Sequence, residues 1–204
     1  MYSILILERR STRKNMVSVT QVQPQITLEE FLELPETKPA SEYIDGKIEQ
    51  KPIPQGEHSV LQGRLGTVIN EVVLPKKLAY AFPELRCTFG GRSVVPDISV
   101  FTWDRIPKTE QGKIANRFEV HPDWVIEILS PEQSANQVIR KIIFCINQGT
   151  QLGWLIDPTD ESVMIFQPNL FPDVKLGEET LPTLETLQDL QLSAKEMFSW
   201  LNFE

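Results

Sequence analysis

Two apolar segments of the sequence each enclose a carboxylate. Asp97 interrupts the apolar residues of segment 93–101, and Glu127 interrupts those of segment 123–130. Acidic residues are depleted in strands, and an ionised carboxylate among Val, Ile and Leu loses several kcal/mol of hydration unless a cation replaces the water. A bound metal ion or a lysine side chain can supply that cation, so the two acids are the first candidates for a functional site.

A magnesium site is one way to satisfy both acids. Side chains alternate between the two faces of a strand, so the carboxylates converge if the two strands are neighbours. Mg2+ prefers oxygen ligands, keeps several waters and needs few protein groups, and Mn2+ is a possible substitute. The predicted metal ligands are Asp97, Glu127 and the main-chain carbonyl of Ile128.

Lys141 is the candidate basic residue. It lies in segment 134–148, at the margin of an isoleucine stripe with helical spacing, so its stem can run inward toward a sheet. A lysine in that place can hold a metal-bound water or stabilise charge on a phosphate, whereas a general base would need a lowered pKa. The structural alternative is a buried ion pair between Glu127 and Lys141 with no catalytic role.

The hydrophobic pattern and the turn signals predict the elements that must position these side chains. Helices are expected at 27–34, 57–73, 134–148 and 193–200, a hairpin at 41–50 with its turn at Asp45-Gly46, and strands at about 78–89, 94–101, 123–130, 151–157 and 162–167. Residues 102–122 are expected to form a long polar loop. This order indicates an α/β or α+β fold in which helices flank a mixed central sheet and a hairpin lies near the N-terminus.

Composition bounds the class of protein. With 204 residues and 41% hydrophobic content, the chain can bury one sizeable core, so we expect a flexible arm at 1–25 and a single domain at 26–204. Cys87 and Cys145 lack metal-site spacing and are interpreted as reduced core thiols. No leader or membrane segment is evident, and a cytoplasmic protein is expected.

The charge distribution limits the partners. A net charge of -8 argues against a polyanionic partner, because nucleic-acid affinity comes largely from basic groups that meet phosphates. However, the acidic excess lies in residues 157–204, whereas Lys and Arg outnumber Asp and Glu within residues 64–117, around Asp97. Glycine-rich nucleotide-binding motifs, HExxH and GxSxG are absent, so the familiar nucleotide-binding, metalloprotease and serine-hydrolase classes are unsupported.

Several short segments together resemble the bacterial "putative restriction endonuclease" family usually called Uma. They are Val95-Pro-Asp97, Val125-Ile-Glu-Ile-Leu-Ser-Pro131, Lys141, Gly149, Trp154-Leu-Ile-Asp-Pro158, Tyr43-Ile-Asp-Gly46 preceded by Glu42, and Glu57-His58. The resemblance covers roughly residues 26–200. It implies the fold of the PD-(D/E)XK nucleases, a restriction endonuclease-like fold.

The resemblance also implies a set of site residues. The strict motif of such nucleases has a lysine two residues after the second acid, where this sequence has Leu129. The resemblance implies that Lys141, on the following helix, takes over that role. The implied site residues are Asp97 and Glu127 as carboxylates, Glu42 as an additional acid, Lys141 as the basic member and His58 as a supporting residue.

The sequence therefore predicts a Mg2+-dependent endonuclease that hydrolyses phosphodiester bonds of DNA. A protein of this size with one cleavage centre is expected to dimerise in order to cut both strands. The alternative is a catalytically degenerate nuclease fold that binds nucleic acid or a protein partner without cutting.

Overall fold

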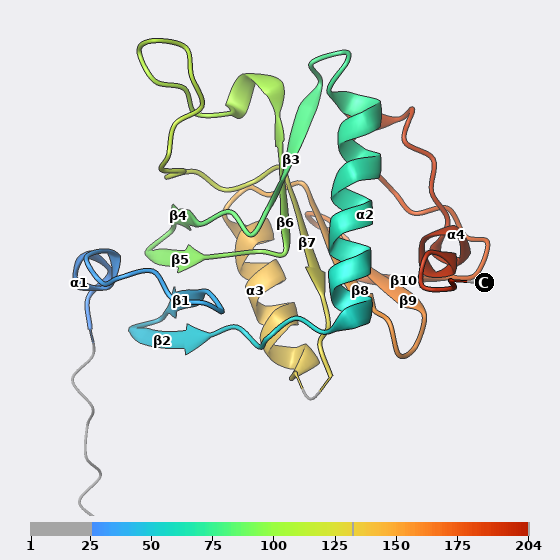
Figure 1. Ribbon diagram of the computed structural model, residues 1–204, viewed down its shortest axis with the longest axis horizontal. Helices are drawn as coiled ribbons and strands as arrows, with labels where there is room; N and C mark the ends of the chain where they lie inside the picture. The colour runs from blue at the N-terminus through green and yellow to red at the C-terminus, as the bar shows by residue number, and fades with distance from the viewer. Residues whose placement is uncertain (1–25, 132, 204) are drawn as a thin grey trace, which may run out of the picture.

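The computed structural model describes residues 26–131 and 133–203 (Figure 1). The arm predicted at 1–25 lies outside the described residues. The helices are α1 (Leu28–Leu32), α2 (Gly56–Val73), α3 (Ala135–Asn147) and α4 (Ala194–Ser199). The strands are β1 (Ser41–Ile44), β2 (Lys47–Gln50), β3 (Ala79–Pro83), β4 (Cys87–Phe89), β5 (Arg92–Val94), β6 (Ile98–Thr102), β7 (Trp124–Ile128), β8 (Leu152–Asp157), β9 (Ser162–Phe166) and β10 (Asp173–Leu176).

The strands form two sheets. The larger sheet has the order β10-β9-β8-β7-β6-β3, and the smaller one has the order β2-β1-β5-β4. β7 and β8 pair in parallel and their neighbours pair antiparallel, so the large sheet is mixed, as predicted. The predicted hairpin is β1 and β2, with positive φ angles of 50° at Asp45 and 81° at Gly46, and it belongs to the small sheet.

Two strand predictions were wrong in the same way. Segment 94–101 was expected to be one strand, but β5 ends at Val94 and β6 begins at Ile98, and segment 78–89 is likewise divided between β3 and β4. Pro96 lies in the first break, and proline has no N–H to donate to a strand ladder. The chain therefore crosses from the small sheet to the large one immediately before Asp97.

Helices cover both faces of the large sheet (Figure 1). Successive residues of β7 point to opposite faces: Ile126 packs in a core cluster with Leu65 of α2, whereas Val125 packs with Ile142 of α3. The odd-numbered positions of β7 thus face α3, which places Glu127 under that helix. Among the residues that the structure describes, no helix is long and apolar enough to cross a bilayer.

The close approach of α3 to the sheet depends on Gly153 in β8. A methyl group there would collide with Ile142 of α3 and lie 3.3 Å from Cβ of Phe166. We expect Gly153→Ala to lower the free energy of unfolding by about 2 kcal/mol, because overpacking a tight core forces side chains to move. Gly63→Ala on α2, with nothing within 4 Å of the added methyl, should instead stabilise by about 0.5–1 kcal/mol. Urea unfolding measures both, and equal effects would contradict this account.

Candidate active site

Three acidic side chains that the sequence singled out come together in the interior. Asp97, Glu127 and Glu42 are 2%, 2% and 5% exposed. β6 and β7 are antiparallel neighbours in which Ile98 pairs with Ile126. Continuing this register by one residue sets Asp97 opposite Glu127, and opposed residues of an antiparallel pair share a face. Glu42 reaches the same place from β1 of the small sheet.

Both oxygens of Asp97 are held by groups of the chain. Lys51 Nζ lies 2.5 Å from Oδ1, and His58 Nε2 lies 3.1 Å from Oδ2. The main-chain N–H of Ile128 also donates to Oδ2, at 2.7 Å. His58 comes from the first turn of α2, so one carboxylate ties α2, β7 and the segment after β2 together.

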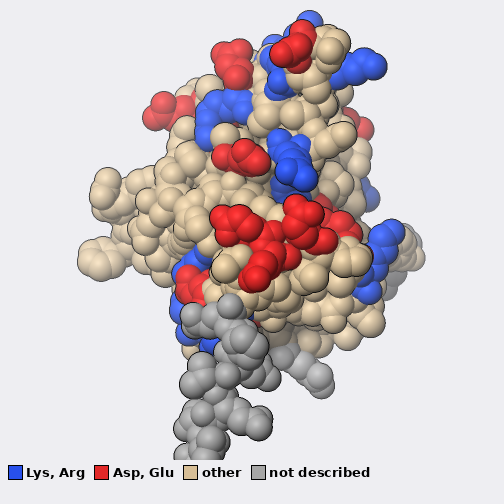
Figure 2. Space-filling model, turned by 90° about the vertical axis from the view of Figure 1, so that its left-hand side faces the viewer, with Lys and Arg blue, Asp and Glu red and all other residues tan. Residues whose placement is uncertain are grey.

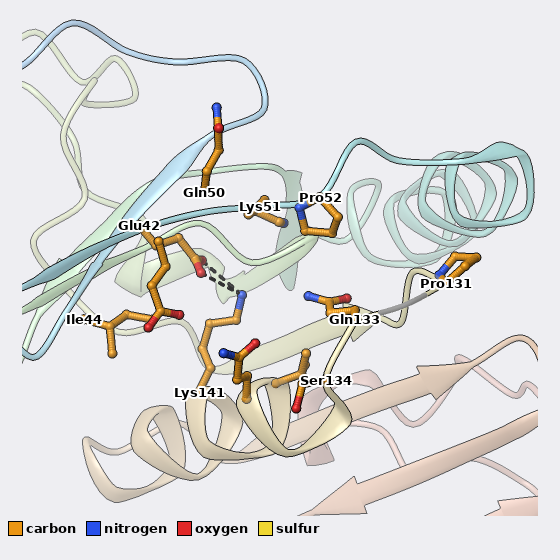
Figure 3. A pocket seen from close by; sticks show the side chains of 12 residues that line it. Glu42, Ile44, Gln50, Lys51, Pro52, Pro131, Gln133, Ser134 and Lys141 are labelled. Carbon is orange, nitrogen blue, oxygen red and sulfur yellow. Dashed lines mark hydrogen bonds and ion pairs between the residues drawn. The ribbon is translucent and has the colours of Figure 1, made fainter. Parts of the chain in front are cut away.

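Lys141 joins the other two acids. Figure 3 shows Glu42 of β1 and Lys141 of α3 pointing toward one another. Lys141 Nζ donates to Glu42 Oε1 at 3.0 Å and to Oε2 at 3.2 Å, and it lies 2.8 Å from Glu127 Oε1. Glu42 is itself anchored by the main-chain N–H of Val95, at 2.7 Å. Glu127 Oε1 is buried and accepts no well-aligned hydrogen bond from the described residues.

The site shifts the pKa values of its members in different directions. Burial alone would raise the pKa of Asp97, but the charge of Lys51 and the hydrogen bond from His58 outweigh it and hold this pKa well below its usual range. Burial alone would lower the pKa of Lys141, but Glu127 and Glu42 raise it. The raised pKa keeps Lys141 positively charged at neutral pH, which suits it to stabilise negative charge rather than to accept a proton.

Glu127 is the exception among the acids. Burial and repulsion from Asp97 raise the pKa of Glu127, and the charge of Lys141 lowers it. Burial has the largest effect, and the resulting pKa is about 7. An ionised Glu127 is thus only partly compensated by its present neighbours. An additional cation beside it would favour the charged form.

This pKa predicts how the stability of the metal-free protein depends on pH. Between the ordinary value of 4.5 and about 7, Glu127 keeps a proton in the folded state that it loses in the unfolded state. Its contribution to stability therefore falls as the pH rises through that window, by about 3 kcal/mol in total. Glu127→Gln should remove this fall, as measured by urea unfolding in EDTA between about pH 5 and pH 8, whereas Glu110→Gln in an exposed loop should not. Parallel profiles for wild type and Glu127→Gln would contradict the prediction.

A cavity of about 420 Å³ opens beside this cluster. Its wall includes two lysines, Lys51 and Lys141, and two acids, Glu42 and Glu49. The rest is uncharged, with Gln133 and Ser134 just before α3 (Figure 3). A group that enters this cavity therefore meets two ammonium groups and two carboxylates, of which Glu42 is already bonded to Lys141. The cavity is therefore the approach to the site.

The donor set fits a hard divalent cation in its chemistry. Asp97 and Glu127 offer carboxylate oxygens on one face of the sheet, and Lys141 Nζ lies 2.8 Å from Glu127 Oε1. In the arrangement that the structure describes, no three His, Cys, Asp or Glu side chains are already gathered around one point. A divalent ion would thus rest on two side chains, main-chain oxygen and water, as expected for Mg2+.

Sequence reasoning missed Lys51. It follows β2, where its main-chain N–H donates to Ala40, and its side chain turns inward with 10% exposure. The residues around Lys51 show no hydrophobic pattern that would indicate which way its side chain points. Only the tertiary structure reveals its contact with Asp97. His58 had been singled out through the resemblance alone, and it lies in the same cluster.

Three of the arginines that lie near Asp97 in the sequence are paired with acidic side chains. Arg86 pairs with Glu36, Arg92 pairs with Asp45, and Arg105 pairs with the buried Asp123. On the face that carries α1 and the small sheet, acidic side chains cluster near the centre of the view and basic ones lie around them (Figure 2). The local basic excess is thus partly neutralised by ion pairs.

The two cysteines are free and buried, as predicted. Burial raises the pKa of the Cys87 thiol to about 12 and also raises that of Cys145. Neither thiol is therefore ionised at neutral pH, which argues against a cysteine nucleophile.

Comparisons with known proteins agree with this architecture. A family model described as "Putative restriction endonuclease" (Uma2) matches residues 28–195. The chain is also similar to the crystal structure of a "putative nuclease belonging to DUF820" from Anabaena variabilis, with 54% sequence identity and a TM-score of 0.86. That match covers 87% of this chain and 99% of the other. The search of curated proteins found no match.

Proposed function

Because the chain belongs to the "putative restriction endonuclease" family, we propose that it is a Mg2+-dependent endonuclease of the PD-(D/E)XK type that hydrolyses phosphodiester bonds of DNA. Its fold is restriction endonuclease-like, as predicted. The observation that carries the proposal is the convergence of Asp97 and Glu127 on neighbouring strands, with Lys141 2.8 Å from Glu127. These are the groups that metal-assisted phosphodiester hydrolysis needs.

The two acids are assigned to the metal. Asp97, Glu127 and the main-chain carbonyl of Ile128 would hold Mg2+. When bound, the ion supplies Lewis-acid activation of the phosphate and lowers the pKa of an attacking water. The β6–β7 pairing sets the main-chain spacing of the two carboxylates before any ligand arrives, so the backbone need not move to bring them together.

Lys141 is assigned to the phosphate. Its ammonium lines the cavity and stays protonated, so it can donate hydrogen bonds to phosphate oxygens as negative charge gathers on them. Glu42 is assigned a positioning role, because it binds Lys141 through both oxygens and is itself held by the main chain at Val95. His58 positions Asp97 through its contact with Oδ2.

A second function is favoured by one observation. Each of the three carboxylates of the candidate site already lies against a lysine of the same chain. A nuclease fold whose acids are neutralised in this way can persist as a module that binds nucleic acid or a protein without cutting. The two functions differ in whether the site takes up a divalent ion.

The deciding experiment is incubation of the purified protein with supercoiled plasmid DNA in MgCl2 and in EDTA, with MnCl2 calorimetry in parallel. The nuclease predicts nicked or linear DNA only with the metal, together with saturable binding of the ion. A non-catalytic module predicts intact DNA and no binding heat. Size-exclusion chromatography of the DNA complex checks the proposed homodimer.

A further inference from the structure

Lys51 is a largely buried lysine that contacts an acid of the candidate site. Its ammonium lies 2.5 Å from Asp97 Oδ1 and donates to the main-chain carbonyl of Val95 at 2.8 Å. The side chain is only 10% exposed, although it leaves the chain just after β2. A carboxylate oxygen and a main-chain oxygen are thus held around one positive charge.

That oxygen pair is the kind of ligand set a divalent ion takes. Asp97 is also the acid assigned to Mg2+, and its other oxygen is engaged by His58 and by the N–H of Ile128. The oxygen that faces Lys51 is therefore the one that an incoming ion must use. An ammonium group and a divalent ion cannot share it, because like charges at contact distance repel strongly.

We propose that Lys51 is a substitute cation: it occupies the metal position at Asp97 in the metal-free protein, leaves when a divalent ion binds, and moves into the adjoining cavity, where it meets a substrate phosphate. The inference rests on the proposed function, since it concerns the same metal site. It assigns to Lys51 a role in metal affinity that Lys141 does not share, and a phosphate contact in addition to that of Lys141.

The two lysines differ in their freedom to move. Lys141 is bound by Glu42 through both oxygens and lies against Glu127, and its main chain is part of α3. Lys51 has one carboxylate partner, and its side chain lines the cavity of about 420 Å³. Its flexible four-carbon stem allows the ammonium to turn from Asp97 into that space without moving the hairpin.

Calorimetry with MnCl2 tests the proposal. Lys51→Met keeps the aliphatic stem and adds no oxygen ligand, so we expect its Kd for Mn2+ to be at least about ten-fold lower than that of wild type, which corresponds to about 1.4 kcal/mol. Lys51→Arg keeps the charge and should stay near the wild-type Kd. Lys47→Met is the matched control, because it removes an exposed charge from the same hairpin and should leave the Kd unchanged.

The outcomes separate this inference from the proposed function. An equal or higher Kd for Lys51→Met, with binding intact in wild type, would overturn the inference alone. Absence of Mn2+ binding in wild type and in every variant would overturn both. Binding in Lys51→Met but not in wild type would show that Lys51 blocks the site, and it would overturn both the displacement of Lys51 by the ion and the metal dependence of the wild-type protein.

A second measurement does not depend on the folding of Lys51→Met. A crystal structure of the wild-type protein soaked in MnCl2 should place Lys51 Nζ beyond hydrogen-bond distance from Asp97 and inside the cavity. An ammonium still bonded to Asp97 beside a bound ion would overturn the proposal. Short DNA should also bind less tightly to Lys51→Met than to Lys47→Met in the presence of Ca2+, and equal affinities would contradict the phosphate contact.

Discussion

Asp97→Asn is expected to reduce Mg2+-dependent DNA cleavage by more than about 100-fold. Loss of a group that merely supports a metal ligand costs about 10–100-fold, and Asp97 is assigned as a ligand itself. Asparagine has the same shape but no negative charge, and its amide N–H2 group would face either Lys51 or the N–H of Ile128, both of which are donors. Plasmid nicking measures the loss, and MnCl2 calorimetry should show that binding of the ion disappears with it.

Two controls keep this result interpretable. The low pKa of Asp97 means that its ionised form stabilises the fold above the ordinary pKa of 3.8 and that this contribution is lost as the pH falls below it. Asp97→Asn therefore also lowers stability at neutral pH, and circular dichroism must establish that the protein tested is folded. Asp104→Asn, at an exposed position, should cleave like wild type. Undiminished cleavage by folded Asp97→Asn would remove Asp97 from the site.

Lys141→Met is expected to lower the free energy of unfolding by about 3–5 kcal/mol at pH 8 and to abolish cleavage. Removing one partner of a buried ion pair leaves an uncompensated charge, and Lys141 compensates both Glu42 and Glu127. Methionine preserves the packing of the aliphatic stem, so the loss of stability measures the effect of removing the positive charge. Urea unfolding in EDTA measures it.

A double mutant identifies which acid causes the loss. Combined with Lys141→Met, Glu127→Gln should recover part of the stability, because it removes one of the two stranded charges. Arg140→Met removes an exposed charge from the neighbouring position of α3 and should change stability by less than about 0.5 kcal/mol. A loss of that small size for Lys141→Met would mean that its buried contacts do not form in solution.

The elements with strong periodicity were predictable from the sequence. The helices at 57–73 and 134–148 agree with α2 and α3 to within a residue, because long amphipathic segments bury one face. The convergence of Asp97 and Glu127 was also predictable, since alternation along two neighbouring strands leaves few arrangements. Their roles as metal ligands remain predictions.

Other features depend on contacts between distant segments. The break at Pro96 separates the two sheets. From the sequence alone, an apolar segment with one proline is predicted to be a single strand, because its pairing partners are not known. β10 at the sheet edge is largely exposed and carries too little alternation to be recognised. The contact of Lys51 with Asp97 joins residues 46 positions apart and leaves no local signal.

The separation of Glu42 and Lys141 along the chain has a consequence for biosynthesis. They are 99 residues apart, and their contact requires the small sheet to be docked against α3. Contacts of such long range form late, after the cost of closing the intervening loops has been met. A chain still emerging from the ribosome lacks this contact until Lys141 has been added and α3 has folded onto the sheet. The cluster of Glu42, Glu127 and Lys141 is therefore complete only when most of the protein has been made, so under the proposed function a partly synthesised chain would lack the assembled site.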